Sequence, residues 1–180
     1  MNAIIAKATF VLALGAAATG ARAFTLTSPE MKPGATIARA HVYTRCGGDN
    51  VSPQLRWQEA PKNTRSYAVT VFDPDAGPDG FWHWIAFNIG AGAHGLNEGA
   101  GTPHSGNAPG DTVQFTNDFG DRGYSGPCPP PGKPHHYVFT AYALDTAILP
   151  VSAAASPKAA AAAIRKHAIA TATLTATYGR

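Results

Sequence analysis

Imidazole and phenol side chains directly follow a stiff loop near residue 130. The stretch 123–139 reads GYSGPCPPPGKPHHYVF, in which prolines and glycines exclude helix and central strand as far as Pro134. His135, His136 and Tyr137 then begin an alternating segment. Such side chains supply N–H and O–H donors, and a rigid loop holds them at one place. The pattern predicts a small polar pocket for an oxygen-rich ligand.

A second group of polar residues surrounds a turn in the stretch 71–88, VFDPDAGPDGFWHWIAFN. An apolar run ends at Asp73-Pro74-Asp75, and the chain restarts at Trp82-His83-Trp84. Because strand side chains alternate, we expect both tryptophans on the core face and His83 on the side where Asp73 ends. An aspartate beside His83 would orient the ring and favour its charged form. Alternatively, Asp73 and Asp75 only cap a turn, as Asp before Pro often does.

Alternating segments predict the strands that must carry these residues. They cover 37–43, 66–72, 82–89 and 136–144, and clusters of Pro, Gly, Asp and Asn separate them. Strands that follow one another without intervening helices favour antiparallel sheets packed as a sandwich. We therefore predict a mainly β, two-sheet fold.

One helix is expected near the C-terminus. Ser156 is suited to the N-cap, Pro157 to the first helical position, and alanines continue the helix to about His167. A Thr-rich alternation over 170–178 then predicts a closing strand.

The first residues have the features of a secretory signal. Lys7 precedes an apolar stretch over 8–18, and Ala21-Arg22-Ala23 is typical of a cleavage site. We expect a signal peptide at 1–23, one domain at 24–180, and a periplasmic or secreted protein. After cleavage the chain has 12 Lys and Arg against 11 Asp and Glu, which argues against a nucleic-acid binder. No stretch has the length and hydrophobicity of a membrane-spanning helix.

The chain has two cysteines, Cys46 and Cys128, both in expected loops. An oxidising compartment favours a disulfide between them. Two free thiols are the alternative, because a sequence does not fix the Cα separation that a disulfide requires.

Several motifs resemble the phosphatidylethanolamine-binding protein family, in particular its bacterial, Raf-kinase-inhibitor-like branch. They occur in order along nearly the whole chain after residue 23. These motifs are Cys46-Gly47-Gly48-Asp49-Asn50-Val51-Ser52-Pro53 with Trp57, Asp73-Pro74-Asp75-Ala76, Trp82-His83-Trp84, Asn117-Asp118-Phe119-Gly120, Gly126-Pro127-Cys128-Pro129-Pro130 with Gly132, His135-His136-Tyr137, and Thr177-Tyr178-Gly179-Arg180.

The resemblance implies a large antiparallel sheet packed on a smaller one, and a shallow pocket for phosphate-like anions or phospholipid head groups. Its residues here would be Asp73, His83, Gly126, Pro127, His135 and Tyr137, with Asp75 bracing the loop. Gly126 would donate its backbone N–H, and Asp73 would pair with His83 or accept from a ligand amine. Gly77 and Arg122 depart from the family pattern, which makes the turn looser and adds a cation near the mouth.

Three other functions compete with non-catalytic binding of a small anion. One is inhibition of a protein partner, a protease or kinase, through the surface. Hydrolysis is disfavoured because Pro127 replaces the glycine of a nucleophile elbow after Ser125. A metal site is disfavoured because the neighbours His135 and His136 point to opposite faces of a strand. We expect no cofactor and no metal.

A glycine-rich stretch, Gly90-Ala91-Gly92-Ala93-His94-Gly95, formally matches a dinucleotide-binding fingerprint. No helix is expected after it, so the match lacks its structural context. We interpret 90–111 as a long surface loop that could cover the pocket.

Overall fold

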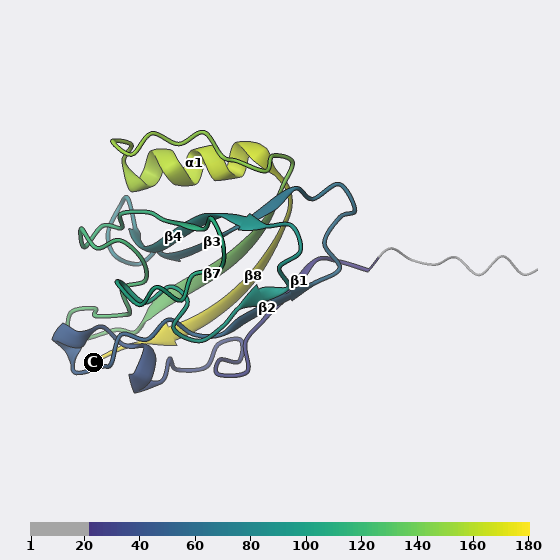
Figure 1. Ribbon diagram of the computed structural model, residues 1–180. Coiled ribbons are helices and arrows are strands. Elements are labelled where there is room, and N and C mark those ends of the chain that lie inside the picture. The colour runs from purple at the N-terminus through teal and green to yellow at the C-terminus, as the bar shows by residue number, and fades with distance from the viewer. Residues whose placement is uncertain (1–21) are drawn as a thin grey trace, which may run out of the picture.

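The computed structural model describes residues 22–180, which form three layers (Figure 1). A five-stranded sheet lies in the middle, a three-stranded sheet covers one of its faces, and the helix α1 crosses the other face. All strand pairs within the two sheets are antiparallel. The prediction of a mainly β, two-sheet fold with a C-terminal helix and closing strand is confirmed.

The large sheet contains every strand that was expected to carry polar site residues. Its spatial order is β6 (Val113–Gln114), β4 (Phe81–Gly90), β3 (Ser66–Asp73), β7 (His135–Leu144) and β8 (Ala168–Tyr178). The small sheet has the order β1 (Thr25–Thr27), β2 (Leu55–Gln58) and β5 (Gly95–Leu96). The short strands β1, β2, β5 and β6 were not predicted, because two to four residues show little periodicity.

Two hydrophobic clusters join the three layers. The cluster between the sheets includes Trp57, Trp84, Phe139 and Leu174, all nearly excluded from solvent. The cluster beneath the helix joins Ile164 of α1 to the opposite face of the large sheet. Because each face of the large sheet is buried over part of its area, its strands are held from both sides.

The helix α1 (Pro157–His167) begins and ends where the sequence predicts. The Ser156 hydroxyl accepts a hydrogen bond from the Ala159 backbone N–H at 3.2 Å, and Pro157 is the first helical residue. Its buried side chains are Ala160, Ala161 and Ile164, so small residues allow α1 to approach the sheet closely.

The segment 37–43 is not a strand, so that prediction is wrong. Two short 3-10 helices, Arg39–His41 and Thr44–Cys46, occupy this part of the chain. Ile37 and Val42 are buried as the alternation suggested, but local turns satisfy the backbone, as in the hydrogen bond from Val42 N–H to Arg39 O. The alternation of apolar and polar residues therefore indicates burial in this segment, and not the pairing of a strand.

The two tryptophans around His83 do not share a face, which corrects a second prediction. A register shift in the pairing of β3 with β4 sets Trp82 opposite Phe72 and Trp84 opposite Val71, so His83 is an extra residue. Trp82 packs beneath α1, whereas Trp84 packs between the sheets. A β-bulge of this kind re-aims side chains, and it turns His83 to the side of the large sheet on which Asp73 lies.

No helix among residues 22–180 has the length and hydrophobicity to cross a membrane. The expected signal peptide lies outside the described residues except for its last two positions.

Replacement of the cap residue tests the account of α1. Ser156→Ala should lower the free energy of unfolding by about 1 kcal/mol, because the Ala159 N–H loses its acceptor. Ser156→Asp should keep stability near the wild-type value, since a carboxylate also caps and interacts favourably with the helix N-terminus. Urea denaturation monitored by circular dichroism would measure both; equal stability of Ser156→Ala and wild type would contradict the capping role.

Candidate functional site

A pocket of about 400 Å³ opens at one end of the large sheet. β3 ends there at Asp73, while β4 begins there at Phe81 and β7 begins there at His135. Antiparallel neighbours bring the end of one strand beside the start of the next, so distant segments meet at this edge. Five expected site residues line the pocket: Asp73, Asp75, His83, His135 and Tyr137.

Two aspartate–histidine pairs connect the turn after β3 to the start of β7. Asp73 Oδ2 lies 2.8 Å from His135 Nδ1, and Asp75 Oδ2 lies 2.8 Å from His136 Nδ1. Asp75 Oδ2 also accepts the His136 backbone N–H, and these hydrogen bonds lower the pKa of Asp75 below its ordinary value. The first pair lies in the pocket, whereas the second pair is half exposed, with Asp75 at the pocket lining and His136 outside it, and braces the turn.

Asp73 pairs with His135 and not with His83, which corrects the expected contact. The other Asp73 oxygen, Oδ1, accepts the Asp75 backbone N–H at 2.8 Å. Asp73 therefore caps the turn and at the same time orients the imidazole of His135, so neither the expected pairing with His83 nor turn capping alone describes this residue. Each Asp73 oxygen thus has one donor from the protein, which uses two of the roughly four acceptor sites of a carboxylate.

His83 is held by the loop that precedes β7. Its Nδ1 lies 2.7 Å from the Ser125 carbonyl oxygen, which can only accept, so Nδ1 carries the proton. Burial lowers the pKa of His83 below 6.5, partly opposed by the Ser125 carbonyl and the charge of Asp73. At neutral pH the ring is therefore uncharged, and Nε2 has a lone pair.

The Tyr137 hydroxyl is a buried polar group without a hydrogen-bond partner in the described chain. It lies at the pocket and near Asp73, but without the geometry of a hydrogen bond. Burial first, and then the negative charge of Asp73, raise the pKa of Tyr137 above its ordinary value. The phenol is therefore protonated and has a donor available at neutral pH.

Aromatic and proline side chains form the apolar walls, and sequence reasoning missed most of them as lining residues. Phe81 and Phe119 meet edge to face, with ring centroids 4.7 Å apart. The centroid of the His83 ring lies 5.1 Å from that of Phe81 and 5.4 Å from that of Phe119. Pro129 and Pro130 form another part of the wall. The polar groups thus lie in a partly desolvated setting, in which hydrogen bonds to a charged ligand are stronger.

A network of buried side chains holds the segment that contacts His83. Asn117 Nδ2 lies 3.1 Å from the His83 carbonyl oxygen and 2.8 Å from Ser125 Oγ. The Ser125 hydroxyl donates to Asp121 Oδ2 at 2.8 Å, and the Tyr43 hydroxyl donates to the same oxygen at 2.9 Å. The Ser125 side chain is fully buried, so the network positions the Ser125 carbonyl that orients His83.

Gly126 and Pro127 lie beside the pocket but do not line it. The Gly126 N–H donates to Asn50 Oδ1 at 2.8 Å, so the expectation that it would donate to an anion is not met. A Cβ at Gly126 would collide with the His41 carbonyl, which explains the glycine by close packing. The Pro127 carbonyl accepts from Tyr43 N–H at 3.1 Å. Both residues therefore fix the loop in place.

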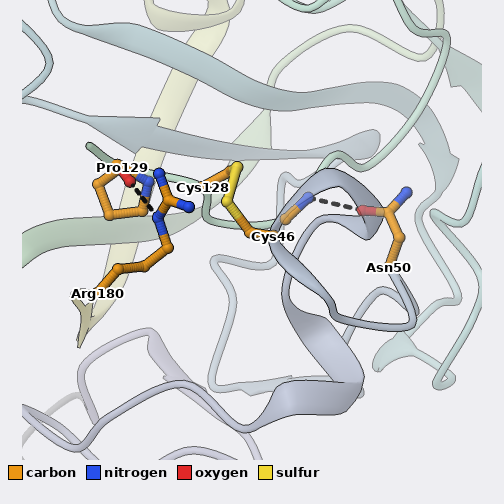
Figure 2. Close-up of a disulfide and its surroundings, with 6 residues drawn as sticks. Cys46, Asn50, Cys128, Pro129 and Arg180 are labelled. Carbon is orange, nitrogen blue, oxygen red and sulfur yellow. Dashed lines mark hydrogen bonds between the residues drawn. A yellow bond between two sulfur atoms is a disulfide. The ribbon is translucent and has the colours of Figure 1, made fainter. Parts of the chain in front are cut away.

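The same loop has a covalent anchor and a C-terminal anchor (Figure 2). A disulfide joins Cys46 to Cys128 with a Cα separation of 5.5 Å. Of the two alternatives left by the sequence, the structure has the bridge. Arg180 Nε donates to the Pro129 carbonyl at 2.8 Å, and the Arg180 carbonyl accepts from Gly132 N–H at 3.1 Å. Cys128 and Pro129 both line the pocket, so the anchors act directly on its wall.

Two other features expected near the pocket, the Arg122 cation and the long loop 90–111, lie elsewhere. Gly77 lines the pocket with a φ of 99°, whereas Arg122 lies in a separate cavity, so the cation expected near the mouth is not there. None of the segment 90–111 lines the pocket, and no helix follows its glycine-rich part. Among residues 22–180, no three His, Cys, Asp or Glu side chains gather in a geometry suited to a metal ion.

Comparison with known proteins identifies the class to which this fold and pocket belong. The family model described as phosphatidylethanolamine-binding protein matches residues 27–179, which is most of the chain. The chain is a member of the phosphatidylethanolamine-binding protein family.

Its relatives include two proteins of Escherichia coli. The chain is 42% identical over 172 residues to UPF0098 protein YbcL of Escherichia coli, covering 93% of this chain and 94% of that protein. It is 36% identical over 156 residues to UPF0098 protein YbhB of the same organism, covering 85% and 98%. The crystal structure of E. coli YbcL, described as a member of the mammalian PEBP family, superposes with a TM-score of 0.85, covering 88% of this chain and 99% of that one at 41% identity.

Removal of the disulfide should destabilise the whole fold. The cysteines are 82 residues apart, so the bridge closes a long loop in the unfolded chain. The double variant Cys46→Ala/Cys128→Ala should lose about 2–4 kcal/mol of unfolding free energy. Guanidinium denaturation with and without reductant would measure the loss. In reductant, the unfolding free energy of the wild type should fall to that of the variant. If the variant is as stable as the oxidised wild type, the disulfide does not contribute to stability.

Titration of His83 tests the electrostatics of the pocket. Its imidazole resonance should titrate with a midpoint below 6.5, because burial disfavours the charged form. Since the unfolded chain takes up this proton at higher pH than the native chain, His83 reduces stability as pH falls below 6.5. Proton NMR, with the resonance assigned by its loss in His83→Gln, would measure the midpoint. A midpoint above 6.5 would contradict the assignment of a neutral ring.

Proposed function

We propose that this protein is a non-catalytic binding protein whose pocket takes phosphate-like anions, including phospholipid head groups, and that it acts in the periplasm or outside the cell after removal of residues 1–23. The proposal rests on the chemistry of the pocket and on membership of the family. The phosphoryl group is the part of such ligands that the pocket would recognise.

The observation that carries the proposal is the buried Tyr137 hydroxyl without a partner. An unpaired buried hydroxyl costs about 1–3 kcal/mol, and a ligand oxygen at this position would remove that cost. His83 and His135 each use Nδ1 within the protein, which leaves Nε2 of each ring for a ligand. One phenol and two imidazole nitrogens on one pocket suit a group with several oxygens.

Protonation would complete the site for a fully ionised ligand. A neutral His83 offers a lone pair at Nε2, which repels an ionised oxygen but accepts from a protonated one. An anion near the ring would raise the pKa of His83 from its depressed value and favour uptake of a proton. The pocket would therefore bind a monoprotonated phosphoryl group directly, or a dianion together with a proton.

The arrangement of carboxylates and hydroxyls favours binding over catalysis. Asp73 has both oxygens engaged, by the Asp75 N–H and by His135. The nearest serine, Ser125, is fully buried, donates to Asp121 and does not line the pocket. A nucleophile that acts on a ligand must reach it, and Ser125 does not reach the pocket.

Replacement of the unpaired hydroxyl should separate ligand binding from stability. Tyr137→Phe should weaken binding of O-phosphorylethanolamine by about tenfold or more, because a hydrogen bond to a charged group contributes about 1.5–3 kcal/mol. Its unfolding free energy should stay at or above the wild-type value, since the lost hydroxyl has no partner in the unliganded protein. Calorimetry and urea denaturation would provide the two measurements.

A buried tyrosine outside the pocket offers a matched control. The Tyr124 hydroxyl is also fully buried but donates to the His41 carbonyl at 2.7 Å. Tyr124→Phe should lose about 1 kcal/mol or more of stability and keep its affinity. Equal affinities of wild type and Tyr137→Phe, or no saturable binding of O-phosphorylethanolamine or inorganic phosphate by wild type, would overturn the proposal.

A further inference from the structure

A second cavity, of about 360 Å³, lies on the opposite face of the large sheet, beside the helix α1. It is independent of the pocket described above and of the function proposed for it. The helix covers only part of this sheet face (Figure 1). Where the buried side chains of α1 end, Thr70 of β3 and Thr140 of β7 line the cavity. The aromatic rings of Phe72 and Trp82 line it as well. We refer to this cavity as the α1 groove.

The α1 groove contains a donor that the protein itself does not use. Trp57 and Trp84 donate their indole N–H groups, to Ala93 O at 2.8 Å and to Gln114 Oε1 at 2.7 Å. Trp82 is only 8% exposed, and its indole N–H donates to no group among residues 22–180 but keeps contact with solvent. A tryptophan buried to this extent usually finds an acceptor in the protein, so an acceptor atom of a ligand in the groove would replace water at this N–H.

Two hydroxyl groups of the groove floor have spare bonding capacity as well. Thr70 Oγ1 and the Tyr142 hydroxyl oxygen lie 3.4 Å apart, at the long end of the range for a hydrogen bond. Both residues are buried. One contact uses one donor of the pair, so a second donor remains.

The rim of the groove has two positive side chains, both from α1, and one negative side chain, Asp79, which leaves one excess positive charge. Lys158 and Arg165 lie two turns apart on the same helix face. Lys158 pairs with Asp79 at 3.0 Å. Arg165 has no carboxylate within ion-pair distance in the described chain, and its guanidinium carbon lies 5.9 Å from the centre of the Trp82 ring.

The unused groups have one property in common. An indole N–H and a guanidinium can only donate hydrogen bonds, so whatever satisfies them must accept. One uncompensated positive charge matches a monoanion, and the planar fork of arginine matches a carboxylate. The rings of Phe72 and Trp82, with centroids 4.4 Å apart, provide an apolar surface for a flat body.

We propose that the α1 groove is a second binding site, for a small aryl monocarboxylate whose ring packs on Phe72 and Trp82 and whose carboxylate accepts from Arg165. Its volume falls within the range of small-ligand sites, which begins near about 300 Å³. The turn 74–80 separates the two sites, since Pro74 and Asp79 line the groove whereas Asp75 and Gly77 line the first pocket.

Sodium benzoate is a suitable probe, and benzyl alcohol is its neutral counterpart. In a ¹⁵N–¹H NMR titration, benzoate should shift the Trp82 indole resonance saturably and leave those of Trp57 and Trp84 in place. Benzyl alcohol should bind at least tenfold more weakly, because it offers Arg165 no charge. Assignment would come from the loss of the resonance in Trp82→Phe.

Neighbouring cations on α1 provide matched variants. Arg165→Gln should weaken benzoate at least tenfold, whereas Lys166→Gln, which removes the same charge from an exposed residue outside the groove, should change it less than twofold. Tyr137→Phe should leave benzoate binding unchanged, since Tyr137 lies at the other pocket. The proposal is overturned if Arg165→Gln and Lys166→Gln lose equal affinity for benzoate, or if benzoate and benzyl alcohol bind equally well. It is also overturned if benzoate shifts only resonances of the first pocket, or shifts no resonance saturably.

Discussion

The antiparallel pairing of β3 with β7 is the constraint on which the site depends. Phe72 pairs with Val138, so the chain leaving β3 and the chain entering β7 meet directly beyond that pair. Asp73 and Asp75 therefore come opposite His135 and His136, although about sixty residues separate them. Hydrophobic burial of the strands on both faces fixes this register, because a slip of one residue would exchange the two faces.

The same register brings the C-terminus to the pocket. β8 pairs with β7 along its length, from Leu144 opposite Ala168 to His135 opposite Tyr178. Arg180 thus ends beside the loop before β7 and holds its Pro129 carbonyl, while the disulfide at Cys128 ties that loop to residue 46. A loop rich in proline cannot use ladder hydrogen bonds, so side chains, a disulfide and the chain terminus hold it.

The protein treats its buried polar groups in two ways. Behind the first pocket, Asn117, Asp121 and Ser125 satisfy one another and the backbone. At the first pocket, the Tyr137 hydroxyl is buried without a partner, whereas the Trp82 indole N–H at the α1 groove has no partner among residues 22–180 but reaches solvent. Since native proteins leave few buried polar groups unpaired, the Tyr137 hydroxyl is the position at which a ligand contributes most.

Local patterns in the sequence predicted two kinds of element: the helix, which its own residues stabilise, and the strands in which alternation extends over many residues. The Ser156 cap and the alanine run identified α1, and alternating segments of seven to nine residues identified β3, β4, β7 and β8, which are eight to eleven residues long. Strands of two to four residues, such as β5 and β6, exist because longer strands or loops lie beside them. The segment 37–43 shows the reverse case: its first residue, Ile37, donates to the Thr177 carbonyl of β8, but the chain then turns into a 3-10 helix instead of continuing as a strand.

The sequence by itself determined the family, the residue types of the site and their arrival from two turns, because motifs and turn chemistry are properties of short stretches. It also placed His135 and His136 on opposite faces, since strand geometry requires it. Only the tertiary structure decided which aspartate pairs with which histidine, that a bulge separates Trp82 from Trp84, and that Gly126 N–H serves Asn50 instead of a ligand. These depend on register, on a one-residue irregularity and on the approach of distant backbone, which packing of the whole chain sets.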